Sequence, residues 1–193
     1  MKPGAMRARR WISIRRQVTH VHRHDAGMPI PNVTVPEGLS ISVLRPTEIG
    51  MLVETWGLDA KEPRRRWERG DRCYLCTLDG QPVCYGWTQR SGKHSIDAAG
   101  RRRVVPPGEA WVYDVYTSEK ARGLGIAPGA LARMFRDAHN DGVATVWVYT
   151  TDDNKASQRA QLRAGLKPAY DLAALVIGPL VIPLGSERPT GIL

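Results

Sequence analysis

Hydrophobic and polar positions form short, well-separated patterns once Pro36 is passed. Period-two alternation and compact runs of β-branched and aromatic residues predict strands over residues 39–44, 73–78, 82–88, 110–117 and 144–149, with two more within 172–184. Apolar residues spaced three and four apart predict helices over residues 47–57, 127–138 and 154–165, and favour another over 61–69. This order predicts an α/β fold: a single domain in which a mixed, mostly antiparallel sheet is flanked by helices.

Two segments between these elements add detail. Asp79-Gly80 joins two apolar runs, and this pair supplies the positive φ angles of a tight hairpin turn. Residues 90–107 contain glycines, three consecutive arginines and two consecutive prolines, with little periodicity. An irregular segment of this length inside a compact domain is typical of a disordered region or a substrate loop.

The N-terminus differs from the rest in charge. The chain has 193 residues, enough for one domain, and a net charge of +9. Seven of its 28 basic residues fall within residues 1–24, which hold no acidic residue. We therefore expect residues 1–36 to be a flexible basic arm, its alternating histidines included, and residues 37–193 to be the domain. The arm fits a solvated tail, a contact with anionic lipid or nucleic acid, or a start of translation at Met28.

Composition disfavours several classes of protein. No apolar run approaches the 20 or so residues of a transmembrane helix, and the apolar stretch 11–14 is too short for a signal peptide. The cysteine count is odd, which disfavours a disulfide framework. Cys73 and Cys76 lie three apart on a predicted strand and so point to opposite faces, which disfavours a shared metal. These features favour a cytoplasmic protein without a metal.

The strongest chemical signal is the run Arg122-Gly123-Leu124-Gly125-Ile126-Ala127, which follows a predicted strand and opens a helix. Glycines let backbone N–H groups converge, and the first turn of a helix leaves N–H groups unpaired with a partial positive charge. Together they predict a site for an anion such as a pyrophosphate. A plain tight turn uses similar residues, and the run matches neither a Walker loop nor the dinucleotide fingerprint.

Within this run, Arg122, Gly125 and Ala127 resemble the coenzyme A pyrophosphate motif, Gln/Arg-x-x-Gly-x-Gly/Ala, of the GNAT superfamily of N-acetyltransferases. The resemblance covers residues 109–167 in motif and about 39–185 in layout. It implies a GNAT-like fold with acetyl-CoA or another acyl-CoA as co-substrate. The N–H groups of residues 123–127 would then hold the pyrophosphate.

A second element agrees with the same family, which often has an Asn, then Ala-Ser, then a Gly about eleven residues after the Asn. Here Asn154, Ser157 and Gly165 stand at the corresponding positions. The resemblance implies that Asn154 reaches the coenzyme arm, with Ser157 nearby. It also implies that backbone groups near Val115 and Thr117 bind the pantetheine, on a strand that splays from strand 144–149.

Direct attack by an amine on the thioester requires a group that takes a proton. Glu109 matches the position of the base in the histone-acetylating branch of the superfamily. Asp114 lies in the middle of an apolar strand, where desolvation would raise the pKa of its carboxyl. Each has an ordinary alternative, a solvated strand-edge residue for Glu109 and a hydrogen-bonded structural acid for Asp114.

One position departs from the family pattern. Many members have a Tyr seven residues after the Asn as general acid for the leaving thiolate, and here that residue is Gln161. A glutamine cannot deliver a proton at neutral pH. Tyr149 or Tyr116 would have to replace it, or the thiolate leaves unassisted, or the fold only binds its ligand.

Together these observations predict an N-acyltransferase, most simply an N-acetyltransferase, that moves an acyl group from acyl-CoA to a primary amine on a small molecule. The basic arm motivates an alternative, an acyltransferase acting on a lipid or polysaccharide precursor at an anionic membrane surface. The residue at 161 motivates another, a non-catalytic acyl-CoA-binding module. Nucleic acid is a less favoured partner, and a homodimer stays open.

Overall fold

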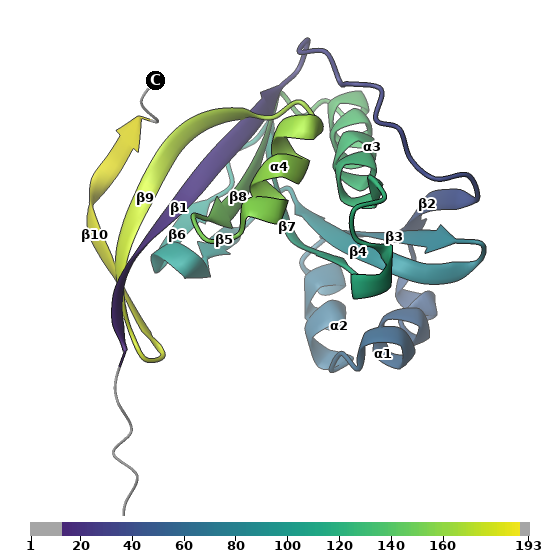
Figure 1. Ribbon diagram of the computed structural model, residues 1–193, viewed down its shortest axis with the longest axis horizontal. Coiled ribbons are helices and arrows are strands. Elements are labelled where there is room, and N and C mark those ends of the chain that lie inside the picture. The colour runs from purple at the N-terminus through teal and green to yellow at the C-terminus, as the bar shows by residue number, and fades with distance from the viewer. Residues whose placement is uncertain (1–12, 190–193) are drawn as a thin grey trace, which may run out of the picture.

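The computed structural model describes residues 13–189, and their side chains as far as residue 186. Its centre is one eight-stranded sheet in the order β10-β9-β1-β8-β7-β4-β3-β2 (Figure 1). Neighbouring strands are antiparallel except β7 and β8, which are parallel. The strands are β1 (Ile14–Asp25), β2 (Leu39–Leu44), β3 (Arg72–Leu78), β4 (Gln81–Gln89), β7 (Glu109–Thr117), β8 (Thr145–Thr151), β9 (Lys167–Ile177) and β10 (Leu180–Pro189). The mixed, mostly antiparallel sheet is therefore confirmed.

Helices cover both faces of this sheet (Figure 1). The longer ones are α1 (Gly50–Trp56), α2 (Lys61–Glu68), α3 (Ile126–Asn140) and α4 (Lys155–Arg163), and the single 3₁₀ turns are η1 (Pro46–Glu48), η2 (Asp97–Ala99) and η3 (Glu119–Ala121). On one face lie α3 and α4. On the other face, α1 and α2 pack on β3 and β4 around a cluster that includes Leu52, Cys73 and Trp87.

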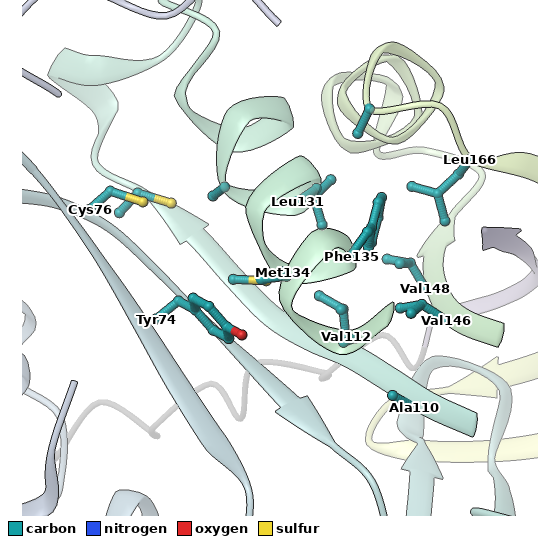
Figure 2. Packing of buried hydrophobic residues seen from close by; sticks show 14 of the residues in the cluster. Tyr74, Cys76, Ala110, Val112, Leu131, Met134, Phe135, Val146, Val148 and Leu166 are labelled. Atoms are coloured by element: carbon teal, nitrogen blue, oxygen red, sulfur yellow. The ribbon is translucent and has the colours of Figure 1, made fainter. Parts of the chain in front are cut away.

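The main core lies between α3 and the sheet. Figure 2 shows Phe135 of α3 beside Val148 of β8, while Met134 extends toward Tyr74 of β3 and Leu131 lies one turn away on the same helix. These side chains are almost completely buried, so the predicted apolar face of this helix is confirmed. Truncating one such residue to alanine typically lowers the free energy of unfolding by about 2–5 kcal/mol. This core therefore supports β7 and β8 firmly on one face of the sheet.

The expectation that residues 1–36 form a flexible arm is wrong for residues 14–25. They form β1, which pairs with β8 on one side and with β9 on the other. Sequence patterning misses this strand because its buried positions are largely polar, including His22 and His24. Burial lowers the pKa of both histidines, so they are neutral core residues and no part of a solvated tail. Residues 1–12 of the expected arm lie outside the described residues.

The segment 90–107 is also more ordered than its composition predicts. It contains a hairpin of β5 (Lys93–Ile96) and β6 (Arg101–Val104), joined by η2. Ile96 and Ala99 are buried with Trp111 in a third cluster beneath this hairpin. Packing against that cluster, and not the local sequence, holds these four-residue strands in place.

Candidate functional site

A cleft opens where β7 and β8 separate. The two strands pair from Glu109 opposite Thr145 to Val112 opposite Val148, and the pairing then stops. On the other side of β7, the register against β4 shifts by one residue, so that Gly86 faces both Asp114 and Val115. This β-bulge bends β7 away from β8. The resulting cleft has a volume of about 740 Å³ and lies between β7, β8 and the facing turns of α3 and α4.

One end of the cleft has the backbone features that the predicted anion site requires. Gly123 and Gly125 adopt φ angles of +83° and +81°, which lead the chain into the first turn of α3. That turn leaves N–H groups without intrahelical partners, and Pro128 within it removes a donor that the helix does not need. The site therefore combines converging N–H groups with the positive end of the helix dipole.

Three arginines line the cleft as well. Arg122 precedes α3, while Arg159 and Arg163 lie one turn apart on α4. The guanidinium of Arg163 lies beside Gly125. Sequence reasoning missed the two arginines on α4, although their i, i+4 spacing places them on one helix face. Their charge matches the diphosphate and the 3′-phosphate that coenzyme A carries.

Gly125 also allows a close backbone contact within the fold. The segment between β1 and β2 runs past α3 (Figure 1), and a Cβ at Gly125 would overlap the carbonyl oxygen of Thr34. The same segment places Val35 against Gly129 and Pro31 against Gly165. By contrast, nothing lies within 4 Å of the position that a Cβ of Gly123 would take. Gly125 is thus required by packing, whereas the space beside Gly123 is open to a ligand.

The cleft brings together nearly all the residues predicted to bind coenzyme A. These are Val115, Thr117, Arg122, Gly123, Gly125, Ile126, Ala127, Asn154 and Ser157. Leu124 does not line the cleft, and its side chain is 46% exposed at the tip of the turn. The end of β7, the start of α3 and the start of α4 meet because α3 and β8 return the chain to the same end of these central strands.

The start of α4 is fixed by Asn154, whose Oδ1 accepts a hydrogen bond from the backbone N–H of Ser157 at 3.0 Å. This is an N-cap contact, so the Asn has a structural role in addition to the role that the resemblance implies. Gln161, on the next turn, is buried and lines the cleft. Its Nε2 donates to Ser157 Oγ at 3.1 Å and to the carbonyl oxygen of Tyr149 at 3.3 Å.

The two phenols considered as proton donors both line the cleft. Burial raises the pKa of Tyr149 to about 12, and its hydroxyl donates to the carbonyl oxygen of Ser95 at 3.4 Å. Tyr116 is 38% exposed and packs on Tyr85 and Trp56. Tyr149 therefore keeps its proton at neutral pH at the point where β7 and β8 part.

The expectation that Asp114 is desolvated is wrong. Its backbone adopts φ +49° in the bulge, and its side chain is 38% exposed. The bulge turns the carboxylate toward α2, where Nη1 of Arg66 donates to Oδ2 at 2.5 Å. The guanidinium of Arg66 also lies 5.1 Å from the ring centres of Trp87 and Tyr113. Asp114 still lines the cleft, but its charge is already paired.

Glu109 lies apart from this cleft, at the end of β7 that pairs with β8. Its Oε2 accepts a hydrogen bond from Nε1 of Trp147 at 2.7 Å. It borders a separate depression of about 400 Å³ together with Arg102, Trp111 and Tyr170. The structure therefore does not bring the two predicted carboxylates together.

The cysteines also fall as the strand periodicity predicts. Cys73 is buried against α1 and α2, and Cys76 on the opposite face belongs to the cluster under α3. Between residues 13 and 189, no group of three or more His, Cys, Asp or Glu side chains is arranged to hold a metal ion. None of the helices in that same range is long and apolar enough to cross a membrane.

Solved structures share this architecture. A GCN5-related N-acetyltransferase from Sphaerobacter thermophilus superposes with a TM-score of 0.62 at 17% identity, over 89% of this chain and 54% of that one. A protein described as a GNAT-family acetyltransferase from Novosphingobium aromaticivorans gives 0.58 at 15%, over 95% and 73%. The ribosomal-protein-S18-alanine N-acetyltransferase from Escherichia coli gives 0.53 at 15%, over 80% and 99%. At these identities the likeness concerns the fold, and this chain spans about half the length of the Sphaerobacter protein.

The chain thus shares its fold with solved N-acetyltransferases. The sequence profile of the Acetyltransferase (GNAT) family matches residues 43–165, and the chain belongs to that family. No curated protein matches the chain by sequence. The resemblance seen in the two motifs and the expected GNAT-like fold are therefore confirmed.

Proposed function

We propose that this protein transfers an acyl group, most simply acetyl, from acyl-CoA to a primary amine by direct attack within a ternary complex. The observation that carries the proposal is the cleft itself: an anion site at the start of α3 continues into the gap between β7 and β8. An elongated ligand with a charged diphosphate at one end and a neutral thioester arm at the other matches this polarity.

The exposed edge of β7 supports the placement of the neutral arm. Past Val112, β7 has no strand partner on the side of β8, so no strand pairs there with Val115 or Thr117. The carbonyl oxygen of Thr117 accepts a hydrogen bond from Nε of Arg122 at 3.3 Å. Peptide-like amides, such as those of a pantetheine arm, pair with an open strand edge as another strand does. The arm would therefore lie alongside β7, with its thioester near the point where the two strands part.

Direct attack is favoured over an acyl-cysteine intermediate. All three cysteines are buried, and none is among the residues that line the cleft. Burial raises the pKa of the Cys73 thiol, which disfavours its nucleophilic thiolate form. Transfer would then depend on orienting the amine and the thioester together, an effect that alone provides a large part of many rate enhancements.

The acceptor is proposed here only as a primary amine. The match to the Escherichia coli neighbour covers 99% of that protein, which is described as acting on an alanine of a ribosomal protein. That description makes a protein N-terminus a reasonable member of the acceptor panel, alongside small-molecule amines.

Thermal unfolding with acetyl-CoA, free CoA and longer acyl-CoAs tests the proposal. A ligand at about 100 times its Kd adds about 2.7 kcal/mol of stability, which raises Tm by at least about 5 °C for a domain of this size. We expect acetyl-CoA to raise Tm and to support acetylation within the amine panel. No shift with any acyl-CoA would contradict the proposal.

A further inference from the structure

His94 lies on β5, next to β7 and β8. Its ring stacks on Trp111 with a centroid distance of 4.7 Å. It also meets the rings of Tyr113 and Tyr149 edge-on, at 5.4 and 6.0 Å. These tyrosines are the first residues of β7 and β8 past the last paired residues, and both line the cleft. The imidazole therefore sits behind the point where the two strands part, on the sheet face opposite α3 and α4.

The tautomer of His94 is fixed by Gln89. The amide Nε2 of Gln89 donates to the carbonyl oxygens of Ser91 at 2.7 Å and Lys93 at 3.1 Å. Its Oε1 therefore faces Nδ1 of His94, at 2.9 Å. Because an amide oxygen only accepts hydrogen bonds, Nδ1 carries the proton and Nε2 carries a lone pair.

That lone pair has no partner within residues 13–189. The residue is only 2% exposed, and a buried acceptor without a donor calls for an explanation. Burial, with the positive charge of Arg69, lowers the pKa of His94 to about 4, while the charge of Asp97 acts in the opposite direction. Near neutral pH the imidazole is thus uncharged, and Nε2 keeps an unpaired acceptor position behind the gap between β7 and β8.

We propose that Nε2 of His94 accepts the proton of the acceptor amine during acyl transfer; this inference rests on the function proposed above. The amine nitrogen forms a bond to the thioester carbonyl carbon, and the carbon–sulfur bond breaks. One proton passes from the nitrogen to Nε2, and the sulfur leaves as a thiolate. The proton on the imidazolium then neutralises the thiolate, so that the products are an amide and free CoA.

The two carboxylates predicted from sequence are less suited to this role. Asp114 is held by Arg66, so its charge is already compensated. Glu109 is held by Trp147, at the end of β7 away from the cleft. Nε2 of His94, by contrast, accepts no hydrogen bond from the described residues, and its ring lies next to the two tyrosines that border the gap.

The first test is nitrogen NMR on protein labelled at histidine, which needs no knowledge of the acceptor. In the free protein, we expect the His94 signals to report a protonated Nδ1 and an unprotonated Nε2. Acetyl-CoA should then shift the Nε2 signal of His94. Adenosine 3′,5′-bisphosphate, which lacks the pantetheine arm, should leave it in place. His24, which contacts Phe135 and His139 on the α3 side, is the internal control for general effects of binding.

The second test uses His94→Phe, which keeps an aromatic ring on Trp111. Loss of one histidine signal in this variant also assigns that signal to His94. His94→Asn is the second variant if His94→Phe does not fold. We expect acetyl-CoA to raise Tm as it does in the wild type, and acetylation of amines to slow by about 100-fold or more. Unchanged His94 signals in protein whose Tm rises with acetyl-CoA would overturn this inference and leave the proposed function standing, as would full activity of a folded variant. Absence of any acetyl-CoA effect on Tm would overturn the proposed function, and this inference with it.

Discussion

At the scale of single residues, the turn before α3 combines a packing role with the proposed binding of the diphosphate. Gly125 lies against Thr34, so a side chain there would disturb the fold whether or not a ligand binds. Ala127 lies one residue inside α3, lines the cleft and is partly exposed. It is therefore the better position at which to change the charge of the anion site without disturbing the packing around it.

We expect Ala127→Glu to weaken acyl-CoA binding by about ten- to hundredfold, because a carboxylate would repel the diphosphate by on the order of 1–3 kcal/mol. Ala127→Gln has nearly the same shape and no charge, and it should bind almost as the wild type does. The fold should not suffer, since an acidic residue in the first turn of a helix is stabilising. Calorimetric titration with CoA measures the effect. Equal losses in both variants would show that size and not charge is responsible.

Asp114 illustrates how a single backbone angle restricts a position. A left-handed backbone such as that at φ +49° costs most residues with a Cβ about 1–2 kcal/mol, whereas Asn and Asp tolerate it. Asp114→Asn and Asp114→Ala both remove the ion pair with Arg66. The alanine variant should nevertheless be less stable by about 1 kcal/mol. Urea unfolding of the two variants measures this difference, to which a hydrogen bond from Arg66 to the new amide oxygen of Asp114→Asn also contributes. Equal stabilities would mean that the bulge relaxes without cost.

At the scale of elements, the sequence predicts α3, α4 and the alternating strands because their periodicities are carried by apolar residues. It misses β1 because the inward positions of that strand include Gln17, Thr19 and His22. It misses the β5–β6 hairpin because four-residue strands are too short to show a pattern. The cleft residues around the start of α3, which belong to the proposed coenzyme A site, are predictable because they follow a continuous motif. The positions of Asp114 and His94 are not predictable in this way. A β-bulge sets the direction of Asp114, and contacts distant in sequence place His94 beside Trp111.

The β5–β6 hairpin carries a testable dependence on pH. His94 has an ordinary pKa of 6.5 when unfolded and about 4 in the folded protein. The unfolded chain therefore binds more protons in this interval. The contribution of the neutral His94 ring to the free energy of unfolding is fully present above pH 6.5 and is lost as the pH falls toward 4. Between pH 7.5 and 5, we expect His94 to account for a loss of about 2 kcal/mol.

His22 and His24 change stability in the same direction, so a variant is needed to separate His94 from them. The difference in unfolding free energy between pH 7.5 and pH 5 should shrink in His94→Phe by about the amount assigned to that ring. Denaturant unfolding at the two pH values measures it. An unchanged difference would mean that the folded protein accommodates a charged His94.

At the scale of the whole molecule, β1 joins the two halves of the sheet. It separates β8, which borders the cleft, from the β9–β10 pair. It also contributes Val21 to the cluster beneath the β5–β6 hairpin. The support of the cleft therefore extends to a strand about 100 residues away in sequence from β7.

Deletion of residues 1–27 should abolish cooperative unfolding, because it removes β1 and leaves both β8 and β9 with unpaired edges. Deletion of residues 1–12 keeps β1 entire while it removes Lys2, Arg7, Arg9 and Arg10. We expect that shorter variant to unfold cooperatively and to keep the rise in Tm with acetyl-CoA. Binding of anionic vesicles or nucleic acid by the basic arm is consequently tested with the shorter deletion, at low and high salt. A cooperative transition near the wild-type Tm after the longer deletion would contradict the place of β1 inside the sheet.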